Sequence, residues 1–157
     1  MDNNVALQRC MKLCSTKEYA PFEISQKISD WGLSTENAET IVNSLIQEKF
    51  IDEFRFARFF VNDKIKFNKW GKIKITMLLR QKGVSKEAIE EALQNFNTEE
   101  YNNILTNELT KKLKTIKTTD KYIVRGKLFQ FGISRGFESD LIYKLLNKLN
   151  LPDMENA

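Results

Sequence analysis

Apolar residues recur every three or four positions along most of the chain, which is the spacing of amphipathic helices. The 157 residues include only six Gly and two Pro, too few turn residues for an all-β protein of this size. We therefore predict an all-α protein. The predicted helices span residues 4–14, 21–31, 35–49, 53–67, 71–82, 86–95, 99–114, 119–134 and 138–149.

Residue types at the predicted helix starts support these bounds. Pro21 suits the first position of a helix, where its missing N–H has no intrahelical partner to lose. Small polar side chains that cap orphan N–H groups stand before three other helices, at Ser34, Ser85 and Thr98. We expect these three residues to be N-caps.

Three glycines mark an internal repeat of about 50 residues. Gly32, Gly83 and Gly136 lie 51 and 53 residues apart, and each follows a predicted helix as a C′ glycine does. An aliphatic residue stands eight positions before each one, at Ile24, Ile75 and Leu128. Gly132 offers a rival register for the third repeat, but the match around Gly136 is longer.

The repeat predicts three tandem three-helix units at residues 1–52, 53–97 and 98–150, followed by a disordered tail at residues 151–157. A unit this small buries little apolar surface by itself, so neighbouring units have to share their apolar faces. We expect an elongated array, whose curvature the sequence leaves open.

Charge is distributed in blocks along the chain. Residues 55–86 hold ten basic side chains against one acid, a net charge of +9 in a chain whose total is +4. A second block, residues 111–135, has a net charge of +7, and the intervening residues 87–110 have −6. Such blocks attract polyanions, nucleic acid first. The alternative is that they are ordinary solvated helix faces with uneven charge.

The first basic block has helical spacing. Arg55, Arg58, Asn62, Lys66 and Lys69 recur at intervals of three and four, which places them on one stripe of a helix. The same periodicity places Phe56, Phe59 and Phe60 toward the core. We therefore expect these three rings to pack inside the protein and not to stack on bases.

Trp70 lies in a short connection between two predicted helices, at the start of the second. Backbone N–H groups at a helix start attract anions, and Lys69, Lys72 and Lys74 add positive charge there. This connection is the best single candidate for contact with nucleic acid. The alternative is that Trp70 is a hydrophobic lid between helices.

Further basic residues complete two predicted patches, one in each of the later repeats. The first patch adds two residues in the second repeat, Arg80 and Lys82. The second patch occupies the corresponding loop and helix of the third repeat, with Lys117, Lys121, Arg125, Lys127 and Arg135. If these residues share one flank, they form an extended cationic face.

The composition also disfavours catalysis. The chain has no histidine, which removes the commonest general base and the commonest metal ligand, and it has no glycine-rich phosphate loop. Two cysteines alone do not complete a zinc site. We expect a binding protein with no cofactor, no metal and no small-molecule substrate. The start has no signal-peptide pattern and no run is long enough to span a membrane, so we expect a cytoplasmic protein. We also expect a monomer, although no feature of the sequence determines the oligomeric state.

Several motifs resemble the RecX family of bacterial recombination regulators. They include Arg55-Phe56-Ala57, Asn62-Asp63-Lys64, Phe67-Asn68-Lys69-Trp70-Gly71 and Lys82-Gly83 in the second repeat, and Arg135-Gly136-Phe137 with Asp140-Leu141-Ile142 in the third. The resemblance is strong over residues 45–93, moderate over 115–149 and weak before residue 40. Phe54 stands where the family usually has a polar or charged residue, and Tyr19-Ala20-Pro21 also departs from its pattern.

This resemblance implies a regulator, active in recombination, DNA repair and the SOS response, that binds the RecA nucleoprotein filament. Proteins of this family lie in the filament groove and suppress strand exchange and ATP hydrolysis, and some also bind DNA directly. The basic residues of the second and third repeats would then face DNA or acidic RecA surface. The rival readings are a stand-alone, sequence-nonspecific DNA-binding protein and a protein–protein adaptor with basic faces.

Overall fold

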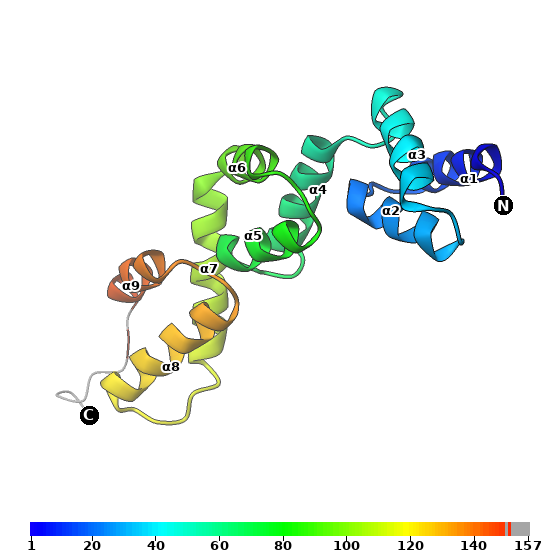
Figure 1. The fold of residues 1–157 in the computed structure, drawn as a ribbon. Coiled ribbons are helices and arrows are strands. Elements are labelled where there is room, and N and C mark those ends of the chain that lie inside the picture. Colours follow the sequence, from blue (N-terminus) through cyan, green and yellow to red (C-terminus); the bar gives the residue numbers. More distant parts are fainter. Residues whose placement is uncertain (150, 152–157) are drawn as a thin grey trace. The chain divides into compact units, whose positions relative to one another are not determined.

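The computed structural model describes residues 1–149 and residue 151, and all regular structure in this part of the chain is helical (Figure 1). The all-α prediction is confirmed, and every predicted helix end lies within two residues of the observed one. Residues 152–157 of the predicted tail lie outside the described residues. The helices are α1 (Asn3–Thr16), α2 (Pro21–Asp30), α3 (Thr35–Gln47), α4 (Glu53–Lys66), α5 (Lys72–Gln81), α6 (Lys86–Asn95), α7 (Thr98–Leu113), α8 (Lys121–Ser134) and α9 (Ser139–Lys148).

Side chains cap several of the helix starts. The hydroxyls of Ser34 and Ser85 each accept a backbone N–H from three residues later, at 3.2 Å, and Pro21 is the first residue of α2, all as predicted. The prediction for Thr98 is wrong, because α7 starts one residue earlier than expected. The Asn97 side chain is the cap and accepts the Glu100 N–H at 2.8 Å, which leaves Thr98 inside the first turn.

The three repeat glycines end their helices in the same way. Gly32, Gly83 and Gly136 have φ angles of +93°, +78° and +89°, in the left-handed region that favours glycine. Each donates its N–H to the carbonyl three residues back, and the next residue donates to the carbonyl five residues back. This pair of bonds is the Schellman motif. Gly132 lies inside α8, so the third turn is at Gly136.

The chain forms two compact units that do not follow the predicted repeat boundaries. The first unit contains Met1–Phe60 and Leu78–Asn95, and the second contains Val61–Met77 and the chain from Phe96 onward. Helices α4 and α5 therefore each contribute residues to both units. The division into three repeats at residues 1–52, 53–97 and 98–150 stays a prediction.

In the first unit, α1 and α2 both pack on α3. Their shared core contains Ala6 and Cys10 from α1, Ile24 and Ile28 from α2, and Leu45 from α3, with exposed fractions between 0 and 1%. Burial raises the pKa of the Cys10 thiol to about 11, so this thiol is protonated and chemically quiet at neutral pH.

The phenylalanines of α4 only partly follow the sequence prediction. Phe56 is buried, and the half-buried Phe60 ring lies 5.8 Å from it, as expected of residues one turn apart. Phe59 is 57% exposed, so its predicted core position is wrong. An amphipathic helix buries only one face, and Phe59 lies one turn after Arg55 on the face of α4 that is exposed to solvent.

In the second unit, α8 packs against both α7 and α9. The core includes Leu105 and Leu109 of α7, Leu128 of α8 and Ile142 of α9, all fully buried. Gly132 allows α8 to approach α9, because a Cβ there would lie only 2.7 Å from the Ile142 Cδ1. Within the described residues, no helix is both long and apolar enough to cross a membrane.

A close backbone contact joins the α4–α5 loop to the α8–α9 turn inside the second unit. Gly71 donates its N–H to the Arg135 carbonyl at 2.7 Å, and Ile73 donates to the Gly136 carbonyl at 3.0 Å. A Cβ on Gly71 would overlap the backbone of Gly136 and Phe137. Glycine is required at this position because any side chain pushes two backbone segments apart.

We expect Gly71→Ala to destabilise the protein by about 2 kcal/mol or more, because the overlap is with backbone that cannot rotate away. For a chain of this length, the melting temperature then falls by about 5 °C, as measured by circular dichroism at 222 nm.

Gly126→Ala is the matched control. Gly126 is inside α8, and nothing lies within 4 Å of the place that a methyl group there would occupy. We expect it to raise stability by about 0.5–1 kcal/mol, because alanine loses less backbone entropy in a helix. A Gly71→Ala protein as stable as the parent chain would contradict the tight contact.

Candidate functional site

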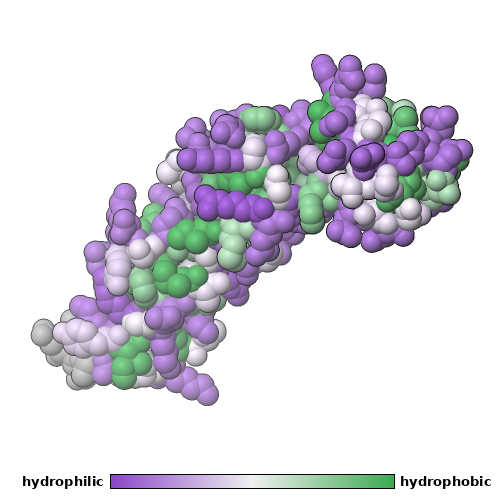
Figure 2. All heavy atoms as spheres, viewed as in Figure 1, coloured by the Kyte–Doolittle hydropathy of each residue, from purple (hydrophilic) through white to green (hydrophobic). Residues whose placement is uncertain are grey.

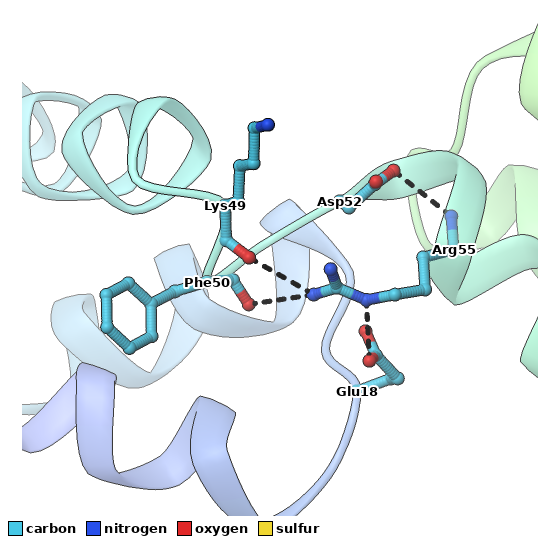
Figure 3. A network of polar contacts seen from close by, with 5 residues as sticks. All are labelled: Glu18, Lys49, Phe50, Asp52 and Arg55. Carbon is cyan, nitrogen blue, oxygen red and sulfur yellow. Dashed lines mark hydrogen bonds and ion pairs between the residues drawn. The ribbon is translucent and has the colours of Figure 1, made fainter.

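The structure places Arg55 in a network inside the first unit. Its Nε donates to the Glu18 carboxylate at 2.7 Å, and its Nη2 reaches the carbonyls of Lys49 and Phe50 at 3.4 Å (Figure 3). The Asp52 carboxylate accepts the Arg55 backbone N–H at 3.1 Å and so caps α4. The guanidinium therefore ties the start of α4 to the end of α3 and to the α1–α2 connection.

Two other predicted cations of the first unit also have carboxylate partners. Arg58 forms an ion pair with Glu91 of α6, and Lys82 forms one with Glu23 of α2 at 3.0 Å. Their positive charge is compensated inside the unit. Arg80 is exposed and has no ion pair among the described residues. Its side chain therefore stays open to a partner.

The α4–α5 loop of the second unit has a constrained shape. Lys69 has a φ angle of +58°, which is uncommon for a residue with a side chain. Trp70 donates its N–H to the Lys64 carbonyl, six residues back, at 3.1 Å, and this bond closes the turn that follows α4. The Lys69 ammonium donates to the Lys66 carbonyl. The loop is thus a fixed turn rather than a flexible connection.

Trp70 lies between two lysines of the flanking helices. The Lys74 Nζ is 4.3 Å from the centroid of the indole ring, and the Lys64 Nζ is 5.4 Å from it. Both distances are within the range of cation–π attraction. The Trp70 ring is half-buried, so part of it remains accessible to solvent. Its contacts with the two ammonium groups keep them close to this exposed part.

A buried tyrosine anchors the same loop to the rest of the second unit. The Tyr101 hydroxyl accepts the Lys72 N–H at 2.9 Å and donates to the Glu138 carboxylate. The Lys72 Nζ lies 4.8 Å from the ring centroid. Burial, aided by the hydrogen bond to Glu138, raises the pKa of Tyr101 well above its ordinary value, so the hydroxyl keeps its proton. The start of α5 is therefore held rigidly.

The charge around this loop is strongly positive. Residues 61–77 contain five lysines and one acid, Asp63. Lys66 approaches Glu100 only to 3.8 Å, and both of these side chains are more than a third exposed, so the pair contributes little. The remaining predicted residue of this stretch, Asn62, is exposed on α4. We call Lys69, Trp70, Lys72 and Lys74 the basic loop.

Apolar side chains also reach the surface beside the basic loop. Phe67 at the end of α4 is 76% exposed, and Ile73 and Met77 on one face of α5 are 57% and 53% exposed. Figure 2 shows apolar residues at the surface among the hydrophilic ones. Exposed rings and aliphatic chains next to lysines without ion pairs are typical of surfaces that bind a partner.

The second predicted patch lies on α8 and the loop before it. Arg135 ends α8, where its carbonyl accepts the Gly71 N–H and its guanidinium carbon lies 4.8 Å from the Phe131 ring centroid. Lys117 and Lys127 line one surface groove. The Arg125 guanidinium donates to the Asn147 side chain at 2.6 Å, and Lys121 is exposed at the start of α8.

The structure brings some predicted residues together and leaves others apart. The basic loop meets Arg135 directly through the Gly71 hydrogen bond, although 64 residues separate Gly71 from Arg135 in the sequence. Arg55, Arg58 and Lys82 have partners elsewhere, in the first unit. No group of three or more potential metal ligands occurs in the described part of the chain.

Sequence reasoning missed the residues that organise the basic loop. Gly71 and Tyr101 make its anchoring contacts, and Lys64 contacts the Trp70 ring. Gly71 did carry a signal, because it follows Trp70 in a motif that resembles a known family. Nothing in the periodicity of α7 distinguishes Tyr101 from an ordinary core residue.

Comparison with known proteins identifies domains in the later part of the chain. The family model for the second three-helix domain of RecX matches residues 52–93, and the model for the third three-helix domain matches residues 99–146. Together these matches include the basic loop, α8 and the α8–α9 turn.

Relatives named "Regulatory protein RecX" match most of the chain. The protein of Prosthecochloris aestuarii is 30% identical over 148 residues, which are 94% of this chain and 95% of that protein. The protein of Clostridium beijerinckii is 27% identical over 136 residues, 85% of this chain, and the match covers only 63% of that longer protein. These names agree with the prediction that the chain is not an enzyme.

Two solved structures have the same fold. A crystal structure of regulatory protein RecX superposes with a TM-score of 0.85 at 22% identity and covers 94% of this chain and 73% of that chain. The RecX structure from Lactobacillus salivarius gives 0.82 at 17% identity and covers 94% of this chain and 96% of that chain. With the domain matches and the relative from Prosthecochloris, the conclusion is plain: this chain belongs to the RecX family of regulatory proteins.

Proposed function

We propose that the chain binds the RecA nucleoprotein filament and inhibits the strand exchange and ATP hydrolysis of RecA. The observation that carries the proposal is the basic loop, which combines lysines without ion pairs, a half-buried tryptophan and a rigid backbone in a chain of the RecX family. The cell compartment of this function is the cytoplasm, and its context is recombination, DNA repair and the SOS response. The chain acts as a monomer without a cofactor.

Rigidity makes the basic loop a suitable contact for a phosphate backbone. Its backbone N–H groups are already bonded to the carbonyls of Lys64 and Arg135 and to the hydroxyl of Tyr101, so the backbone loses little conformational entropy on binding. Lysines act on phosphates as point charges and carry no base specificity. The proposed contact with DNA is therefore strong at low salt and independent of sequence.

Inhibition requires no chemistry from this chain. A filament that hydrolyses ATP moves between conformational states, and a protein that binds one state more tightly shifts the population toward it. A cationic protein that contacts neighbouring RecA subunits and their DNA restrains that movement. The difference in affinity for the two states sets the extent of inhibition.

The first prediction concerns RecA itself. We expect the DNA-dependent ATP turnover of purified RecA to fall severalfold when this protein is present at saturating concentration. The triple variant Lys69→Gln/Lys72→Gln/Lys74→Gln should raise the concentration for half inhibition by about tenfold, if each lost charge contributes about 0.5 kcal/mol.

The matched control is Lys12→Gln/Lys144→Gln/Lys148→Gln, which removes the same charge from exposed lysines that have no ion pair among the described residues. It should inhibit like the parent protein. Unchanged ATP turnover at saturation would refute the proposed function.

The second prediction concerns salt. If about four lysines engage phosphates of a single strand, a fourfold rise in salt weakens binding by roughly fiftyfold. For the Lys69/Lys72/Lys74 triple Gln variant, the same rise should weaken binding by only roughly threefold, because about one contact remains. Fluorescence anisotropy of dye-labelled oligothymidine measures the affinity of both proteins at each salt concentration. If affinity falls equally steeply with salt for the two proteins, the basic loop is not the phosphate contact.

The third prediction uses the two tryptophans of the chain. In Trp31→Phe, Trp70 is the sole reporter, and oligothymidine should change its emission because bases approach the ring. In Trp70→Phe, Trp31 reports alone, and its emission should stay constant, because it lies in the first unit against Arg9 at 4.9 Å.

The same contact is tested by affinity. Trp70→Ala should weaken oligothymidine binding by about tenfold, within the range measured for base–aromatic stacking. Circular dichroism verifies that the variant keeps its helicity. A folded Trp70→Ala protein with the affinity of the parent would mean that Trp70 is only a packing residue.

A further inference from the structure

A groove in the second unit has features that DNA binding does not explain. It is an open depression of about 1110 Å³ between the end of α7, the α7–α8 loop and α8. Three lysines line it, Lys112, Lys117 and Lys127. The aliphatic and aromatic side chains of Ile116, Ile123 and Phe131 form much of the remaining lining.

Every charged side chain that lines the groove is positive. No aspartate or glutamate is among its described lining residues, and no ion pair of Lys112, Lys117 or Lys127 exists in the described part of the chain. The nearest acid in sequence, Asp120, caps α8 by accepting the N–H groups of Tyr122 and Ile123 at 3.0 and 3.4 Å. The potential inside the groove therefore favours an anionic occupant.

The apolar lining restricts the kind of anion. Ile123 is 48% exposed, although a branched aliphatic side chain gains nothing from solvent or from a phosphate chain. Phe131 contributes an aromatic ring to the lining, and Arg135 and Lys112 lie 4.8 and 5.6 Å from its centroid. A ligand with both carboxylates and apolar side chains satisfies lysines and aliphatic residues together.

We propose that this groove binds an amphipathic acidic helix of a protein partner. The apolar face of that helix lies on Ile116, Ile123 and Phe131, and its carboxylates lie near the three lysines. Such helices bind hydrophobic grooves through apolar residues spaced three and four apart. Gly126 leaves the necessary room, because nothing lies within 4 Å of where its Cβ would be.

The inference deepens the proposed function, since it assigns this part of the basic surface to protein and not to DNA. It rests on that function only for the source of the helix, which a RecA filament would supply. A peptide experiment without RecA therefore tests it separately. If the protein leaves ATP turnover unchanged but binds the peptide, the proposed function fails and the groove stands.

The probe is a dye-labelled peptide of about 18 residues, five helical turns, with Leu along one face, Glu beside it and Ala elsewhere. Its control is a scrambled isomer of the same composition. At roughly 150 mM salt, where surface attraction is screened within about 8 Å, we expect the patterned peptide to bind about tenfold or more tightly than the isomer in fluorescence anisotropy.

Two variants test the groove in independent ways. Gly126→Leu places a branched side chain in the groove without changing its charge. Lys117→Gln/Lys127→Gln removes charge without changing the apolar lining. Each change should weaken peptide binding by about tenfold. Both act on exposed positions, so the fold is kept. The matched control Lys144→Gln/Lys148→Gln, on exposed residues of α9, should change affinity less than about twofold.

Three results would overturn the proposal. Equal affinity for the two isomers would mean that only charge attracts the peptide. An unchanged affinity of Gly126→Leu would place the peptide elsewhere. The groove would be a nucleic-acid site if oligothymidine displaced the peptide and if Gly126→Leu weakened oligothymidine binding.

Discussion

The second unit depends on a contact between two backbone segments that leaves no room for a side chain. Gly71 and Ile73 donate N–H groups to the α8–α9 turn, and Gly136 in that turn has a left-handed φ and the Lys74 side chain where a Cβ would lie. Two hydrogen bonds and two glycines therefore determine the distance between the basic loop and α8. Because the loop backbone is held there, its lysines extend from fixed Cα positions.

The positive residues form two groups, those that are paired with carboxylates and those that have no ion pair among the described residues. In the first unit, Arg55, Arg58 and Lys82 are paired with Glu18, Glu91 and Glu23, so they contribute to packing between helices. In the second unit, Lys74 and Lys72 of the basic loop lie near the rings of Trp70 and Tyr101, and no carboxylate among the described residues pairs with them. The positive potential that a polyanion encounters is therefore weaker than the number of basic residues suggests, and it is concentrated at the basic loop.

The sequence predicted the helices well because local physics determines them. Apolar periodicity, small polar caps and the left-handed glycines act within a few residues, and Gly32, Gly83 and Gly136 end their helices by the same two hydrogen bonds. The cap predicted at Thr98 failed by one residue because the neighbouring Asn97 accepts the N–H at that helix start.

The candidate site was only partly predictable, because it depends on contacts between distant residues. Periodicity placed Arg55 on a solvent stripe, but it carries no information on Glu18, which lies 37 residues earlier and binds that guanidinium. The role of Tyr101 in holding Lys72 is equally invisible in a single sequence, since both groups look ordinary on their own helices. Residue type and local spacing indicate which charges exist, and only the fold determines which of them remain unpaired.

The left-handed backbone of Lys69 has a consequence for how this position can vary. A residue with a side chain holds this conformation at a cost of about 1 kcal/mol, which glycine would avoid. Glycine would also delete an ammonium group at the centre of the basic loop. The left-handed backbone and the positive charge of Lys69 thus occur at one residue, whose ammonium also bonds to the Lys66 carbonyl. A glycine there would relax the turn and would lose both that bond and the charge.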